Sequence, residues 1–126
     1  MDCENMMYNF INTYVYNTEV NEIHGYASFT LKCEDGKYRT VLFRDMFYCQ
    51  VNEACEQKKI TSIYETNLGK LRSDDYAGIF VLLKKECANI TDEYLQMLEE
   101  KSYRFYIHTI DEHEYLVIAK NILYEQ

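Results

Sequence analysis

Two histidines and three acidic residues lie close together towards the end of the sequence: His108, Asp111, Glu112, His113 and Glu114. Imidazole and carboxylate groups are ligands for zinc and other transition metals, so two histidines from opposite strands of a hairpin could converge on one ion. The HxxxxH spacing matches no recognised zinc motif, and a solvated acidic turn beside a packed histidine explains the same residues. We therefore predict no metal ligands and no cofactor.

The cysteines are the other residues with metal-binding or nucleophilic chemistry: Cys3, Cys33, Cys49, Cys55 and Cys87. Their number is odd, and no pair has the CxxC spacing that is typical of a thiolate metal site. Cys3 and Cys55 have the more polar surroundings, but no neighbouring motif supplies a base for a cysteine nucleophile. The pattern favours reduced thiols, several of them packed in the core.

Acid–base catalysis would need two groups that meet in the fold, and the candidates are His24, His108 and His113. Acidic pairs such as Asp74-Asp75 are explained by solvated charge, and the scattered glycines form no phosphate-binding loop. We predict no catalytic residue. The alternative is a small enzyme or ligand-binding domain with a pocket between the predicted helix 91–101 and the sheet.

The charge of the chain is strongly acidic, with a net value of −8 at pH 7. Residues 86–126 carry nine acidic and three basic residues, which is a net charge of −6. General electrostatics therefore disfavour direct binding of nucleic acid or of an anionic membrane. The same charge suits a basic protein partner or mimicry of a polyanion.

Tyrosine is unusually frequent, with 13 copies in 126 residues, although an AT-rich genome such as that of a phage or a low-GC bacterium would also favour it. Tyrosines and acidic side chains together are typical of protein interfaces. The predicted helix 91–101 and the hairpin after it are adjacent in sequence, so we expect their side chains to share one interaction face. The residues predicted for this face are Asp92, Glu93, Glu99, Glu100, Asp111, Glu112, Glu114, Tyr94, Tyr103, Tyr106 and Tyr115.

These features predict a small acidic protein without catalysis, an inhibitor or immunity-type module that occupies the basic, nucleic-acid-handling site of a partner protein. A phage or mobile element that encodes such an anti-defence inhibitor would fit the composition. A homodimeric structural subunit joined by its tyrosines is a further alternative. The chain has no apolar stretch near the ~18 residues of a membrane helix and no secretory signal at its start, so we expect it in the cytoplasm.

The clearest structural signal is the Asp35-Gly36 pair, because a two-residue type I′ turn requires positive φ at both central positions. This turn predicts a hairpin over 26–44 in which Phe29 lies opposite Leu42. Because side chains alternate between the two faces of a strand, Leu31 should lie on the same buried face.

Helical spacing of apolar residues favours a helix over 2–17 with Asp2 as its cap, although the same stretch also alternates as a strand does. Asn52 predicts a short capped helix as far as Lys59, and Thr91 begins a helix that continues to about residue 101. Strands are predicted over 60–65, 78–85, 103–110 and 114–120.

The apolar run 78–85 suits a buried strand or the middle of a helix, and a strand is preferred because two adjacent helices would be crowded. With the helix 91–101 and the strand 103–110 it would form a βαβ crossover. The hairpin of 103–110 and 114–120 has two apolar faces, which indicates central strands. The predicted fold is a single α+β domain, with a mixed, mostly antiparallel sheet of five or six strands and two or three helices.

Overall fold

The computed structural model describes residues 5–125 and has an α+β fold. Its strands are β1 (Asn5–Asn21), β2 (Tyr26–Lys32), β3 (Tyr38–Cys49), β4 (Lys59–Thr66), β5 (Arg104–Ile110) and β6 (His113–Glu125). All three α-helices lie between β4 and β5, and they are α1 (Leu68–Leu71), α2 (Ala77–Glu86) and α3 (Asp92–Glu100). Two short 3-10 helices, η1 (Glu53–Cys55) and η2 (Asp74–Tyr76), complete the set of elements in these residues.

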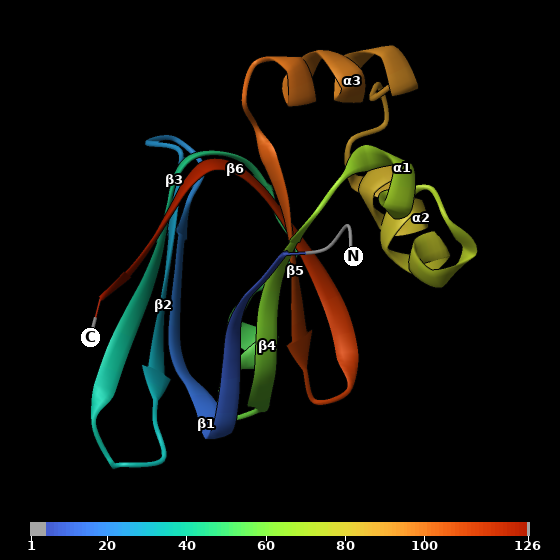
Figure 1. Cartoon of the computed structure of the whole chain (residues 1–126). Coiled ribbons are helices and arrows are strands. Elements are labelled where there is room, and N and C mark those ends of the chain that lie inside the picture. The colour runs from blue at the N-terminus through green and yellow to red at the C-terminus, as the bar shows by residue number, and fades with distance from the viewer. Residues whose placement is uncertain (1–4, 126) are drawn as a thin grey trace.

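The strands form one antiparallel sheet that closes into a barrel in the order β1-β2-β3-β6-β5-β4, with β4 pairing with β1. This confirms the predicted α+β fold, with a sheet of six strands and three α-helices. Every strand pair in residues 5–125 is antiparallel, so the parallel pairing of the βαβ crossover is not formed. The helices gather on one side of the barrel (Figure 1).

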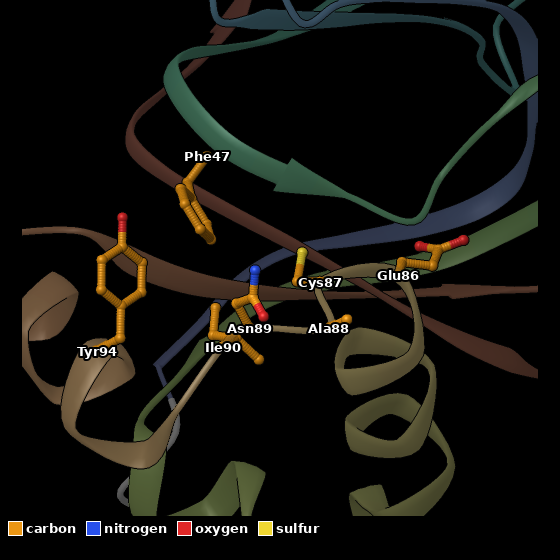
Figure 2. Close-up of a pocket in the computed structure, with 7 residues that line it drawn as sticks. All are labelled: Phe47, Glu86, Cys87, Ala88, Asn89, Ile90 and Tyr94. Carbon is orange, nitrogen blue, oxygen red and sulfur yellow. The ribbon is translucent and has the colours of Figure 1, made fainter.

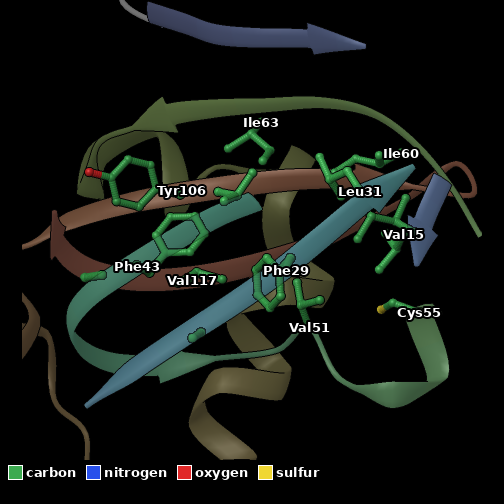
Figure 3. Close-up of a cluster of buried hydrophobic side chains, with 14 residues drawn as sticks. Val15, Phe29, Leu31, Phe43, Val51, Cys55, Ile60, Ile63, Tyr106 and Val117 are labelled. Carbon is green, nitrogen blue, oxygen red and sulfur yellow. The ribbon is translucent and has the colours of Figure 1, made fainter. Parts of the chain in front are cut away.

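Two hydrophobic clusters lie on opposite faces of the strands. The first fills the interior of the barrel and includes Phe29 and Phe43 (Figure 3). The second, which we call the outer layer, joins Phe105 and Leu116 on the outside of the barrel to Leu95 of α3. Alternate residues of β5 and β6 therefore point into different cores, which explains why both faces of this hairpin are apolar. The prediction that these two strands are central is confirmed, because each pairs on both sides.

The first strand corrects the helix expected over 2–17. Residues 2–4, including the expected cap Asp2 and also Cys3, lie outside the described residues. From Asn5 onward the chain is extended, and it pairs first with β4 and then with β2. Val15 is buried, whereas Tyr14 and Tyr16 are exposed. The apolar residues of this segment fit both helical spacing and the alternation of a strand. The segment is a strand because it pairs with a neighbouring strand on each side.

The β2–β3 hairpin is present, but its turn differs from the expected one. The Gly36 N–H donates to the Cys33 carbonyl at 2.9 Å, and the Cys33 N–H donates to the Lys37 carbonyl at 2.8 Å. Only Gly36 has a positive φ, of 82°, whereas the expected type I′ turn would need one at Asp35 as well. This is a three-residue loop, a type I turn followed by a glycine bulge.

The longer loop shifts the register of the hairpin by one residue. Phe29 lies opposite Val41, where Leu42 was expected. Because a one-residue slip moves every side chain to the other face, Val41 and Phe43 are the buried residues of β3 within the hairpin, and Leu42 is only half-buried. Phe29 and Leu31 are buried as predicted.

The type I′ geometry is found instead between β5 and β6. Asp111 and Glu112 have φ values of 53° and 66°, and Ile110 pairs directly with His113. The hairpin predicted over 103–110 and 114–120 is confirmed, and β6 continues beyond it to Glu125.

The strand expected over 78–85 is wrong, because this run forms α2. Ile79 and Leu83 are buried against the outer layer, whereas Val81 is 68% exposed. A continuous apolar run fits a buried strand and a helix equally well, so periodicity could not separate the two. The crowding that argued against a second helix is avoided because the link over 87–91 turns the chain, with Ile90 buried at the bend.

The remaining elements follow the local signals more closely. Thr91 caps α3 through a hydrogen bond from the Tyr94 N–H, as predicted, and the strand expected over 60–65 is β4. Asn52 also caps as predicted, but only the short η1 follows it, and β4 begins at Lys59. Within residues 5–125, none of the helices combines the length and the apolar composition that crossing a membrane requires.

Candidate functional site

The acidic residues predicted to share one face lie in two places. Those of α3 come before the start of β5, and those of the β5–β6 turn come after its end (Figure 1). Seven strand residues at about 3.3 Å each separate the two groups by roughly 20 Å. The group at the turn is joined by a further carboxylate from another part of the chain.

That carboxylate belongs to Asp75, which borders an open hollow of about 480 Å³ between the start of α2 and the β5–β6 turn. We call this feature the acidic hollow, and its lining residues are Asp75, Gly78, Ile79, Thr109, Glu112, His113 and Glu114. Three carboxylates and no lysine or arginine line it. Asp75 and Glu112 are both exposed, so their charges face solvent.

Glu114 is held in place by Tyr64 of the outer layer, whose hydroxyl also contacts that of Tyr76. The Tyr64 hydroxyl donates to Glu114 Oε2 at 3.1 Å, and it lies 2.5 Å from the Tyr76 hydroxyl. Burial, followed by the bond to Tyr76 and the nearby Glu114 charge, raises the pKa of Tyr64. The phenol therefore stays protonated and remains a donor that orients the carboxylate at the rim of the hollow.

The carboxylates of α3 are partly engaged in structural contacts. Asp92 pairs with Lys84 of α2 at 3.7 Å, and Glu99 Oε2 accepts a hydrogen bond from the Leu68 N–H at 3.1 Å. Glu93 and Glu100 are exposed. This end of the molecule therefore uses part of its acidity to join the helices to one another.

The four tyrosines predicted for the interaction face have different environments. Tyr94 is 41% exposed and packs on Phe47, with ring centroids 5.6 Å apart. Tyr103 is half-buried in the outer layer, where the Lys120 ammonium lies 5.1 Å from its ring centroid. Tyr106 is only 3% exposed in the interior cluster, and Tyr115 packs against that cluster. Of these four tyrosines, Tyr106 is therefore the one that is fully buried, whereas Tyr94, Tyr103 and Tyr115 are at least partly exposed.

The three histidines lie in three different environments. His108 is fully buried inside the barrel between Phe29 and Phe43, whose ring centroids lie 5.6 and 5.3 Å from its own. His113 lines the acidic hollow, and His24 lines a separate hollow beside Arg44. In the part of the chain that the structure describes, no three histidine, cysteine or acidic side chains are arranged to hold a metal ion.

Burial dominates the electrostatics of His108. It lowers the pKa of the imidazole to about 3, and backbone groups of Tyr106 and Tyr115 offset this only in part. Neither ring nitrogen has a partner in hydrogen-bonding geometry. His108 is therefore a neutral residue of the core and has no access to an external ligand.

The described cysteines are free thiols. Burial raises the pKa of Cys49 to about 12, and burial together with Glu86 and Glu22 raises the pKa of Cys87. A thiolate is the reactive form of cysteine, so these environments work against nucleophilic chemistry.

A second feature lies between α3 and the sheet, where the alternative interpretation expected a pocket. Its volume is about 440 Å³, and its lining residues are Phe47, Glu86, Cys87, Ala88, Asn89, Ile90 and Tyr94 (Figure 2). A neighbouring hollow of about 430 Å³ shares Phe47, Glu86 and Cys87 with it and extends to Glu22. We call the two together the β3 groove.

The Glu86 carboxylate of this groove is positioned by a buried chain of hydrogen bonds. The Leu116 N–H donates to Gln50 Oε1 at 2.9 Å, and Gln50 Nε2 donates to the Tyr48 hydroxyl at 3.1 Å. That hydroxyl donates to Glu86 Oε1 at 2.5 Å. Each donor satisfies the next acceptor, so the exposed carboxylate has an orientation that is set from within the fold.

The chain was compared with protein-family models, with curated proteins and with solved structures. None of the three comparisons gives a significant match.

Several residues of the two features were not singled out from the sequence. Asp75 was interpreted only as solvated charge, and Tyr64 reaches Glu114 across 50 positions of the chain. Phe47, Tyr48 and Glu86 belong to segments that meet only when the barrel closes and the helices dock. No local motif marks such long-range neighbours.

Proposed function

We propose that the protein is a non-catalytic binding protein that engages a basic surface on a partner protein, as an inhibitor or immunity-type module does. The observation that carries this proposal is the acidic hollow, where Asp75 joins Glu112 and Glu114 without any lining lysine or arginine. A basic, nucleic-acid-handling site on the partner is the surface that such a polyanionic feature would complement. A phage or mobile-element origin fits the same role.

The positions of the histidines support binding over acid–base catalysis. A general base must lie within hydrogen-bonding reach of the group on which it acts. His108 is sealed inside the barrel, and His24 and His113 line different hollows. The geometry therefore favours recognition through charge.

Charge of one sign that is gathered at a protruding turn speeds the encounter with an oppositely charged partner. Asp111 and Glu112 form the tip of the β5–β6 turn, and Asp75 stands beside it. The partner should therefore associate quickly at low ionic strength, and salt should slow the association.

Affinity capture from the native host, with three forms of the protein as bait, tests the proposal. The first bait is the wild type, and the second carries Asp75→Lys with Glu112→Lys. The third carries Glu100→Lys with Glu125→Lys, which makes the same change in net charge elsewhere on the surface. All four of these side chains are exposed, so the variants should stay folded.

We expect the wild type and the third bait to retain the same partner. The hollow variant should retain it at least about tenfold less, because two exposed charge contacts worth up to about 1 kcal/mol each become repulsive. Equal retention of the partner by all three baits would contradict a role for the acidic hollow.

A further inference from the structure

We propose that the β3 groove binds the guanidinium group of an arginine from a basic protein segment. This inference rests on the proposed function, since it gives a basic partner a specific point of insertion. The site is separate from the acidic hollow, because the lining residues of the two features do not overlap.

The aromatic walls of the groove suit a planar cation. Phe47 lines both parts of the groove, and its ring packs beside that of Tyr94 with an interplanar angle of 49° (Figure 2). Tyr94 is 41% exposed, so its ring is open to a ligand. A guanidinium group stacks on such faces through cation–π attraction, and it is more weakly hydrated than an ammonium group.

The carboxylates of the groove supply the matching charge. Glu86 uses Oε1 to accept the Tyr48 hydrogen bond, and Oε2 has no partner among the described residues. Glu22 lines the same groove, and both carboxylates act on the Cys87 thiol that lies between the two hollows. A cation at this point would be attracted by two negative charges, one of which is held in a defined orientation.

Among the described residues, no lysine or arginine competes for this position. Neither lysine nor arginine lines either part of the groove. Lys84 of the neighbouring helix is instead paired with Asp92 at 3.7 Å, and its ammonium lies 5.3 Å from the centroid of the Phe80 ring. The groove therefore combines aromatic faces and unneutralised carboxylates, which is the environment that selects a guanidinium group.

The test is a titration of the full chain with a short peptide, followed by NMR. The probe is acetyl-Gly-Arg-Gly-amide, and the matched controls replace arginine with citrulline, which is uncharged and nearly isosteric, or with lysine. We expect the arginine peptide to shift the amide signals of Phe47, Cys87 and Tyr94. The citrulline peptide should leave those signals unchanged, and the lysine peptide should bind more weakly than the arginine peptide.

Two variants locate the charge contact. Glu86→Gln keeps an oxygen that can accept the Tyr48 hydrogen bond, and Glu22→Gln alters an exposed side chain, so both should retain the wild-type Tm. Each should weaken binding of the arginine peptide by about fivefold, the upper range for one exposed charge contact. Glu112→Gln, in the acidic hollow, should leave the affinity for the peptide unchanged.

Three results would overturn the inference: equal binding of the citrulline peptide, shifts that map away from the groove, or unchanged affinity in both groove variants. If Glu112→Gln weakens peptide binding and the groove variants do not, the arginine site is the acidic hollow, and the proposed function stands without the groove. If the groove binds arginine as described while all three baits capture the partner equally, the groove stands and the role of the acidic hollow fails.

Discussion

The barrel interior and the outer layer are both hydrophobic, but they differ in how their buried polar side chains are hydrogen-bonded. In the interior, the imidazole of His108 lies among aromatic rings with neither nitrogen hydrogen-bonded. In the outer layer, the hydroxyls of Tyr48 and Tyr64 donate hydrogen bonds to surface carboxylates. One chain runs from Gln50 through Tyr48 to Glu86, and another joins Tyr64 to Glu114.

This difference separates the part of the molecule that maintains the fold from the part that positions its candidate sites. His108 in the interior has no hydrogen bond to either the acidic hollow or the β3 groove among the described residues. The outer layer orients one carboxylate in each. Changes in the interior should therefore alter stability alone, whereas polar changes in the outer layer should also alter binding.

The largest expected effect is that of removing an aromatic ring from the interior. Phe43 is fully buried between Phe29 and Tyr106, with ring centroids at 5.8 and 5.2 Å. Phe43→Ala should lower the free energy of unfolding by about 3–5 kcal/mol, because it removes buried apolar surface and leaves a cavity. Urea denaturation measures the change. A loss below about 1 kcal/mol would mean that the interior is not packed around this ring.

The next effect comes from pH and concerns His108. The folded pKa is about 3, against an ordinary value of 6.5, so between these values the unfolded chain binds a proton that the folded chain does not. The contribution of this site to stability is therefore fully present above pH 6.5 and is lost as the pH falls. By pH 5 the free energy of unfolding should have dropped by about 2 kcal/mol.

His108→Leu supplies the comparison for this pH dependence. The phenols that face this part of the interior, Tyr106 and Tyr115, have raised pKa values and stay neutral over the range. Urea denaturation at several pH values from 7 to 5 measures the free energy of unfolding of both proteins. This free energy should fall less in the variant than in the wild type, and the difference should equal the contribution assigned to His108. Parallel curves for the wild type and the variant would show that the imidazole is accessible to protons in the folded state.

A smaller effect is expected in the outer layer. Tyr64→Phe removes the hydroxyl that bonds to Glu114 and Tyr76, and it should lower the free energy of unfolding by about 1 kcal/mol. It should also raise the off-rate of the captured partner, because Glu114 loses the donor that orients it. Tyr16→Phe is the control, since the Tyr16 hydroxyl makes no hydrogen bond among the described residues. The same off-rate in both variants would show that the Tyr64 hydrogen bond does not contribute to partner binding.

Local signals in the sequence identified the elements whose ends are marked by particular residues. Thr91 marked the start of α3, and the Asp35-Gly36 pair marked the first hairpin. The same pair fits both a type I′ turn and a type I turn with a glycine bulge, so it could not determine the register. The apolar patterns of the run 78–85 and of the first strand each fit both a helix and a strand. Which of the two forms is decided by the elements that pack against or pair with each segment.

The candidate sites depend on contacts that are distant in sequence. Glu112 and Glu114 were expected to carry charge at an interaction surface, but their neighbour Asp75 comes from the helical segment between β4 and β5. Glu86 and its donor Tyr48 are 38 positions apart. Such pairs form when the barrel closes and the helices dock, and the composition of the sequence predicts neither event.

The most direct test of the proposed function is the association rate of the captured partner, measured by stopped flow at low and at physiological ionic strength. The wild type is compared with the Asp75→Lys/Glu112→Lys variant and with the Glu100→Lys/Glu125→Lys control. We predict that the hollow variant associates more slowly than the control at low salt, that this gap narrows as salt rises, and that off-rates change little. Equal association rates for the hollow variant and the control at both salt concentrations would contradict the proposal that the acidic hollow guides a basic partner.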